Sequence, residues 1–318
     1  MPITLPPINR REFIRDSLAL GSTATMLARG ASAAARDGSK LDQNRVALLA
    51  DTHISANPQL SYPGTKWPGS PVPEHEHESV NMARCLANVA KNIIALNPRP
   101  THLIINGDCA MSRGTEAEYK ELLRLLEPVR LAGITVHATI GNHDNREKLW
   151  KLLPFLKKEQ MGVQAGVIDL PHANLVLLDS GRRGILGDKQ LSWLARELDE
   201  RTDKPALVFG HFNPFPNKGV RPIKGMSDGS SLLKLLKDRK HARAYLYGHT
   251  HEWQHARMEH LHVIGQPAVS YYFGKGHAHG SLDMKLTKNF ADLELQCIDS
   301  NHKQHRARKR VSLKEKRT

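Results

Sequence analysis

Residues 139–144 decide the fold and the chemistry of this chain, and they read Thr139, Ile140, Gly141, Asn142, His143 and Asp144. The segment from Val136 to Ile140 is rich in β-branched residues and predicts a buried strand. Gly141 lets the backbone turn sharply after that strand. The next three residues supply an amide, an imidazole and a carboxylate, and an amide oxygen is a neutral ligand for a metal ion. The stretch therefore predicts a strand whose carboxyl end carries functional groups.

Four other segments repeat this pattern of a buried strand followed at once by polar side chains. The strands are expected at 46–50, 103–106, 207–210 and 244–247, and the polar residues after them are Asp51 and His53, Asp108, His211, and His249 with His251. Amphipathic helices predicted at 79–97 and 117–130 make the connections parallel crossovers. Ligands of such a sheet lie at the carboxyl ends of its strands. We expect an α/β fold in which five strand ends converge on one site.

The composition limits the number of domains, the class of partner and the type of metal ligand. A chain of 318 residues with 40% hydrophobic and 25% charged residues predicts one large globular domain, or two at most. A formal net charge of +14 favours anionic partners such as phosphate esters, nucleic acid or an acidic surface. The three cysteines, Cys85, Cys109 and Cys297, are too far apart to suggest a disulfide framework or a cysteine metal site. Any metal ion must be held by His, Asp and Asn.

The N-terminus is typical of an export signal. Arg10 and Arg11 precede a weakly apolar stretch, which is followed by the small-residue run 31–35. Paired arginines, a short apolar region and an A-x-A-like cleavage site predict a twin-arginine signal peptide over residues 1–35. The alternative is an amphipathic helix that opens the domain. An exported chain would be periplasmic or otherwise extracytoplasmic, and no later apolar run reaches transmembrane length.

The remainder divides into a domain and a tail. The folded domain is expected over 44–300, followed by a basic tail over 301–318 that could bind nucleic acid or an anionic surface. Within the domain, residues 55–78 form a long segment without periodicity, which favours a flap over the site. Tyr62 or Trp67 would then offer a stacking surface for the leaving group of a substrate. The alternative is a surface excursion. The sequence predicts no oligomeric state.

The polar residues at the strand ends suit two metal ions that share a ligand. A bridging ligand needs two usable oxygens, and Asp108 is the natural candidate. Grouping the others by reach gives two sets that share Asp108, namely Asp51, His53 and His251 for one ion, and Asn142, His211 and His249 for the other. Mixed imidazole and carboxylate ligands suit divalent or trivalent Mn, Fe or Zn more than Mg or Ca. Two such ions neutralise phosphate oxygens and acidify a bridging water to hydroxide.

Three residues near the central motif have roles beside the ions. His143 is the candidate catalytic residue, because its imidazole could contact the phosphoryl group or protonate the leaving oxygen. Asp144 is expected to orient an imidazole from behind the ligands. Arg146 could contact the phosphate of the substrate, and its alternative role is to start a helix.

These motifs, taken together, resemble the calcineurin-like metallophosphoesterase superfamily. Five motifs occur in the order and rough spacing of that superfamily over about residues 44–275. Within the superfamily, this chain most resembles the bacterial class III cyclic-nucleotide phosphodiesterases, on the residues around 107–119, 141–146 and 178–194. The resemblance implies a four-layer αββα sandwich of two mixed sheets, with a dinuclear site at the strand ends. One departure is Met111, which stands where purple acid phosphatases have a ligand tyrosine, so a tyrosinate–iron colour is not expected.

The leading functional hypothesis is metal-dependent hydrolysis of phosphate esters, with diesters preferred, by attack of a metal-bridging hydroxide. A phosphomonoesterase or a nuclease of the same fold is the alternative within this class. A basic protein that only binds nucleic acid or the cell envelope is the alternative from another class. Binding by counterion release needs Lys and Arg, not a full set of Asp, Asn and His at strand ends, so the motifs favour the enzyme.

Overall fold

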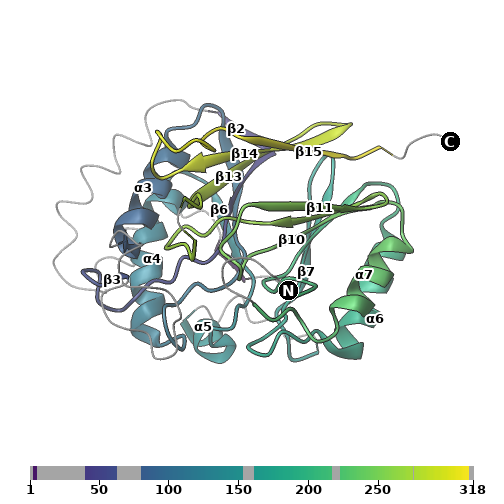
Figure 1. The fold of residues 1–318 in the computed structure, drawn as a ribbon, viewed down its shortest axis with the longest axis horizontal. Helices are drawn as coiled ribbons and strands as arrows, with labels where there is room; N and C mark the ends of the chain where they lie inside the picture. Colours follow the sequence, from purple (N-terminus) through teal and green to yellow (C-terminus); the bar gives the residue numbers. More distant parts are fainter. Residues whose placement is uncertain are drawn as a thin grey trace.

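The computed structural model describes residues 3–5, 40–62, 80–152, 161–216, 223–274 and 276–314 (Figure 1). Apart from residues 3–5, the predicted signal peptide with its paired arginines lies outside the described residues, and so does Trp67. None of the described helices is long and apolar enough to cross a membrane.

The first sheet has seven strands in the order β1-β6-β5-β2-β13-β14-β15. Their bounds are β1 Ile3–Leu5, β6 Thr135–Ala138, β5 Arg99–Ile105, β2 Leu41–Leu49, β13 Gly280–Leu286, β14 Phe290–Cys297 and β15 Arg308–Ser312. Strands β6, β5 and β2 are parallel, as the crossover pattern predicts, and the other pairings are antiparallel. Their parallel direction puts the three carboxyl ends at one edge.

The second sheet has six strands in the order β11-β12-β10-β9-β8-β7. Their bounds are β11 Gln254–Met258, β12 Leu261–Gly265, β10 Ala242–Tyr247, β9 Ala206–Phe209, β8 Asn174–Leu177 and β7 Gly166–Asp169. The four central strands are parallel, and the two edge strands are antiparallel to their neighbours. A small pair, β3 Ser61–Tyr62 with β4 Val80–Asn81, lies apart from both sheets.

Helices cover the outer faces of both sheets. On the first sheet lie α3 Met82–Ile94, α4 Glu116–Leu131 and α5 Arg146–Leu152, and on the second lie α6 Gly187–Glu200 and α7 Gly229–Lys237 (Figure 1). One apolar cluster fills the space between the two sheets, and one lies under each helical layer. This arrangement confirms the predicted four-layer αββα sandwich of two mixed sheets.

The helices begin where local chemistry predicts. Thr115 caps α4, because its hydroxyl accepts from the amide of Glu118 while the Glu118 carboxylate accepts from the Thr115 amide. The buried residues of α3 include Leu86, Val89 and Ile93, which recur at helical spacing and face the sheet. These helices fix the strands between them and so hold the loops that follow.

One expectation about the C-terminal half is wrong, and two further segments differ from what their sequence pattern suggests. Residues 308–312 are not a separate tail but the edge strand β15, paired with β14. Residues 268–272 are not a strand, because the amides of Val269 and Ser270 bond the carbonyls of Ala50 and Asp51 and the chain then turns away. Strand β11 was not expected, since its exposed polar residues lack apolar alternation. The three cysteines are free and buried.

Candidate metal centre

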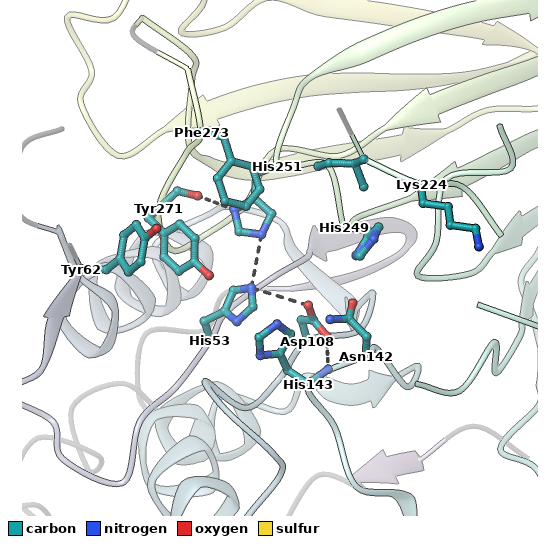
Figure 2. A pocket seen from close by; sticks show the side chains of 11 residues that line it. His53, Tyr62, Asp108, Asn142, His143, Lys224, His249, His251, Tyr271 and Phe273 are labelled. Carbon is teal, nitrogen blue, oxygen red and sulfur yellow. Dashed lines mark hydrogen bonds and ion pairs between the residues drawn. The ribbon is translucent and has the colours of Figure 1, made fainter. Parts of the chain in front are cut away.

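The polar residues at the five strand ends lie together at one edge of the two sheets. Each follows a parallel strand by a few residues: Asp51 and His53 after β2, Asp108 after β5, Asn142 and His143 after β6, His211 after β9, and His249 and His251 after β10. Figure 2 shows that those from opposite sheets point toward one another. The predicted convergence of five strand ends is therefore present in the structure.

Five of these residues have an unusual backbone conformation. The described residues include eight other than glycine with positive φ, and five of these are Asp51 at 53°, His53 at 44°, Asp108 at 47°, His249 at 65° and His251 at 55°. The left-handed region is unfavourable for residues with a Cβ atom and is retained where function requires it. The backbone is thus strained so that these side chains can face the site.

Glycines beside these side chains provide the space that they need. A Cβ atom on Gly107 would lie 2.4 Å from Nδ1 of His211, and one on Gly141 would lie 2.2 Å from Oδ1 of Asp108. Gly107 also has a φ of 78°, which only glycine adopts readily. The glycine in each motif is therefore required for close packing of two neighbouring loops.

The first group of side chains consists of Asp51, His53 and His251. Nε2 of His251 lies 3.3 Å from Oδ1 of Asp51 and 3.2 Å from Nε2 of His53. Nε2 of His53 lies 3.6 Å from Oδ2 of Asp108. All three side chains are buried.

The second group consists of Asp108, His211 and His249, with Asn142 beside them. Nε2 of His211 lies 3.2 Å from Oδ2 of Asp108 and 3.2 Å from Oδ1 of Asn142. One potential ligand atom of each of Asp108, His211 and His249 lies within 4.8 Å of the others. Because Asp108 also falls in a group with His53, it lies between the two halves of the site. The geometry groups these residues as the sequence predicts.

The donor set fits metal ions on geometric grounds. Metal bonds to imidazole and carboxylate are about 2.0–2.2 Å long, so adjacent ligand atoms lie roughly 2.8–3.6 Å apart. The N···O and N···N separations above fall in this range. The Nδ1–H of His251 donates to the carbonyl of Tyr271 at 2.6 Å and that of His211 to the carbonyl of Asn106 at 3.0 Å. In neutral rings the Nε2 lone pairs then face other acceptors, which is favourable only with a proton or a metal ion between them.

Burial keeps two of these imidazoles neutral. It is the largest influence on His53 and on His249, and it lowers the pKa of His53 well below its usual value and that of His249 to about 3. Burial would also lower the pKa of His211, but the carboxylates of Asp108 and Asp51 raise it to about 9. Burial opposes the ionised form of Asp108, yet the charge and hydrogen bond of His211 are the main causes that hold its pKa well below the usual range. The centre thus favours an ionised Asp108 beside a positively charged His211.

His143 lies closer to the centre than expected. Its backbone amide donates to Oδ1 of Asp108 at 2.8 Å, and its ring nitrogen Nδ1 bonds the carbonyl of Met111 at 2.7 Å. The ring stands edge-on to His53 with centroids 4.8 Å apart. With Nδ1 occupied by Met111, Nε2 is the nitrogen that can serve a substrate. The backbone carbonyl of Met111 thus orients His143, whereas the Met111 side chain cannot bind a metal ion as a tyrosine would.

Asp144 joins the two loops that carry Asp108 and Asn142. Its buried carboxylate accepts from the amides of Cys109 at 3.2 Å, Ala110 at 3.1 Å and Gly141 at 2.9 Å, and from the hydroxyl of Tyr119 at 3.2 Å. Burial and the charge of Asp108 raise the pKa of Asp144 to about 6. Asp144 therefore orients backbone loops, whereas the sequence analysis predicts contact with an imidazole.

Arg146 does not line the pocket over the centre. Its Nε lies 2.6 Å from Oδ2 of Asp179, and Nη1 donates to the carbonyl of Gly162. It is also the first residue of α5. The structure therefore supports its alternative role at the start of a helix, and the expected contact with substrate phosphate has no support here.

A pocket of about 270 Å³ opens over the centre (Figure 2). Besides the residues already described, its lining includes Tyr62, Tyr271, Phe273, Ile223 and Lys224. Tyr62 stacks on Tyr271 with centroids 3.9 Å apart, and Tyr271 stacks on His53. The sequence predicts only Tyr62. Tyr271 lies in segment 268–272, which has the composition of a strand, and Lys224 follows no pattern that could have identified it.

The sequence of this chain matches the calcineurin-like phosphoesterase family over residues 44–253, so the chain belongs to that family. It is a metallophosphoesterase.

Two curated bacterial relatives carry names for diester hydrolysis. The 3′,5′-cyclic adenosine monophosphate phosphodiesterase CpdA of Pseudomonas aeruginosa is 26% identical over 210 residues, which cover 64% of this chain and 74% of the relative. A probable glycerophosphodiester phosphodiesterase GpdQ of Arcobacter nitrofigilis is 29% identical over 175 residues, covering 53% of this chain and 57% of the relative. This chain thus matches little more than half the length of the second relative.

Solved structures share the fold. A dimetal phosphatase from Danio rerio superposes with a TM-score of 0.62 at 16% identity, covering 85% of this chain and 96% of that chain. A purple acid phosphatase from yellow lupin gives a TM-score of 0.57 at 12% identity, covering 85% and 53%. At these identities the likeness shows the fold alone.

Proposed function

We propose that this chain hydrolyses phosphodiesters at a centre of two transition-metal ions that share Asp108. The observation that carries the proposal is the convergence of seven ligand-type side chains from five strand ends, with Asp108 in two of the groups. Both curated relatives described above are named for diesters, which supports a diester over a monoester. A phosphomonoesterase or nuclease of the same fold is the alternative.

The residues that would hold the ions follow from the two groups. Asp51, His53 and His251 would bind one ion with Asp108, and Asn142, His211 and His249 would bind the other with Asp108. Mixed imidazole, carboxylate and amide ligands suit Mn, Fe or Zn. When bound, such ions neutralise the phosphoryl oxygens and acidify a water molecule. The protein supplies fixed geometry, because backbone carbonyls orient the rings of His211 and His251.

His143 is the proposed general acid. Its Nδ1 is occupied by the carbonyl of Met111, and Nε2 would give a proton to the leaving oxygen. The amide of His143 also holds Oδ1 of Asp108, so the acid and the shared carboxylate keep a fixed relation. Hydrolysis of an ester whose leaving group is unstable as an anion depends on this proton most.

The test uses two diesters of different leaving group. In metal-loaded His143→Ala, turnover of an alkyl diester should fall by about 10²–10⁴-fold, and that of bis(p-nitrophenyl) phosphate much less. Metal content should stay at the wild-type level. His172→Ala, in the turn between β7 and β8, is the matched control. Equal losses for the two esters would assign His143 to stabilisation of phosphoryl charge instead.

The purely binding alternative has less support than the enzyme. In β15, Arg308 pairs with Glu294 and Arg310 pairs with Asp292, so these two cations of the basic segment are already neutralised. A protein that bound nucleic acid or the envelope mainly through this segment would leave these cations without acidic partners. Assays with phosphomonoesters, linear and cyclic diesters and single-stranded DNA, each with Mn, Fe and Zn, distinguish these functions.

We also propose export through the twin-arginine route, on the basis of Arg10, Arg11 and the small residues at 31–35. That route carries folded proteins, so the metal ions could be bound before export. An extracytoplasmic location would make an intracellular cyclic nucleotide a poor natural substrate.

A further inference from the structure

The pocket over the centre has two unlike walls. Tyr62, Tyr271 and Phe273 line the side near His53 and His251, whereas Lys224 lies on the opposite side, beyond His249 (Figure 2). Aromatic rings and a cation recognise different chemical groups. The two arms of a diester in this pocket would therefore meet different surroundings.

A second loop joins the wall that carries Lys224. The amide of Ser227 donates to the carbonyl of Gly184 at 2.9 Å. The carboxylate of Asp228 accepts from the amides of Leu186 at 2.9 Å and Gly187 at 2.8 Å. The loop after β8, residues 180–187, is thus fastened to the segment 223–228.

This loop also packs behind His249. Gly184 lies against the ring of Phe212, so close that a Cβ atom there would be 2.8 Å from Cδ1. The Phe212 ring lies in turn 4.3 Å from the ring of His249. Arg182 and Arg183 precede Gly184 directly, so the loop that carries them packs behind His249 through Phe212.

Arg182, Arg183 and Lys224 form what we call the basic rim. All three are exposed, and within the described parts of the chain none has an acidic partner. Some exposed cations elsewhere are paired, for example Arg124 with Glu121. The carboxylates in the two segments are Asp188, at the start of α6, and Asp228, which bonds backbone amides. Lys224 therefore puts a positive charge on the pocket wall, and Arg182 and Arg183 add exposed positive charge on the loop that is fastened to this wall.

The position of His143 indicates which arm would reach the rim. His143 stands against His53, so the leaving oxygen that it protonates lies on the His53 side. The arm that stays on the phosphate then extends toward His249 and the basic rim. A diester with only one phosphate would place that phosphate at the centre, and its retained arm would then carry no anionic group to pair with the rim cations.

We propose that the basic rim of Arg182, Arg183 and Lys224 binds further phosphate groups on the retained arm of the diester, an inference that rests on the proposed function. The substrate class is a diester with two or more phosphates. Such phosphates belong either to a small molecule or to an oligonucleotide chain, and the chemistry at the rim is the same for both.

The test compares three esters with one leaving group. Each is a p-nitrophenyl ester of thymidine 5′-phosphate, with a free 3′-hydroxyl, with a 3′-phosphate, or extended at the 3′ end by two nucleotides. An exposed charge pair contributes roughly 1.5–5-fold, so the metal-loaded enzyme should prefer the 3′-phosphate over the hydroxyl by about 3–30-fold in kcat/KM. Salt should reduce this preference. A further rise on extension identifies an oligonucleotide, and no further rise identifies a small phosphorylated molecule.

Variants locate the effect at the rim. The Arg182→Gln, Arg183→Gln double variant should lower kcat/KM for the 3′-phosphate at least about three-fold more than for the 3′-hydroxyl. Lys288→Gln, in the turn between β13 and β14, removes an exposed cation elsewhere and should keep the preference. Equal kcat/KM for the three esters in the wild-type enzyme, or equal losses in the double variant, would overturn the proposal. No turnover of any ester would contradict the proposed diesterase activity itself.

Discussion

Replacing Asp144 with alanine should reduce the free energy of unfolding of the metal-free protein by about 3–5 kcal/mol, because this removes the centre of a buried hydrogen-bond network. The Asp144 carboxylate accepts from three backbone amides and from the hydroxyl of Tyr119. Each buried donor left without an acceptor costs about 1–3 kcal/mol. The four costs are not additive, since the loops relax and admit water.

Asparagine at the same position should be milder. Burial and Asp108 raise the pKa of Asp144 to about 6, so keeping this carboxylate ionised at pH 7.5 costs about 3 kcal/mol relative to an exposed one. Asp144→Asn removes that cost and keeps one oxygen acceptor, so we expect a loss of at most about 2 kcal/mol. Metal affinity should nevertheless fall about 10–100-fold, because the amide group cannot hold both ligand loops.

The assay is urea unfolding of chelator-treated protein at pH 7.5, followed by titration of the folded variants with Mn or Zn. Asp203→Ala, at an exposed carboxylate in the turn before β9, is the control and should change stability by less than about 0.5 kcal/mol. A loss below 1 kcal/mol in Asp144→Ala, or wild-type metal affinity in Asp144→Asn, would refute the view that Asp144 joins the two loops.

Three further predictions follow from other residues. Burial and His102 lower the pKa of His137 to about 3, so between pH 6.5 and 3 only the unfolded chain binds a proton at this residue, and stability is lost as the pH falls. In urea unfolding, the wild-type protein should therefore lose about 2 kcal/mol more stability between pH 7 and 5 than His137→Leu does. The same loss in both proteins would contradict this. Gly141→Ala should abolish turnover and metal binding, because its Cβ atom would lie 2.2 Å from Oδ1 of Asp108; a fully metallated, active variant would be inconsistent with the loop packing. Replacing Arg10 and Arg11 with lysine should retain the precursor in the cytoplasm, and mass spectrometry of exported protein should show a terminus near 33–35, not Met1.

Much of the centre is predictable from sequence because its chemistry is local. A β-branched run followed by Gly and an Asp, Asn or His marks a strand end, and parallel strands place such ends at one edge. This is why Asp51, Asp108, Asn142 and His211 could be grouped before the fold was known. Whether each of them binds an ion stays a prediction, since contact among side chains does not measure occupancy.

Features without a local pattern escaped prediction. Strand β15 has a charged sequence, and only its pairing with β14 makes it part of the sheet. The segment 268–272 has the composition of a strand, yet it bonds the loop after β2 for only two residues. Tyr271 consequently reaches the centre from a loop. Arg182 and Arg183 become notable only through contacts between Gly184, Phe212 and His249.

The metal content of purified protein tests the central claim most directly. Elemental analysis of the wild-type chain should give two transition-metal ions per chain, because Asp108 lies between two groups of ligands. Asp108→Ala removes the shared ligand and should retain at most one ion and lose turnover. Asn142→Ala should likewise lose metal and activity. Two ions per chain in Asp108→Ala, with turnover near that of the wild type, would contradict a dinuclear centre built on Asp108.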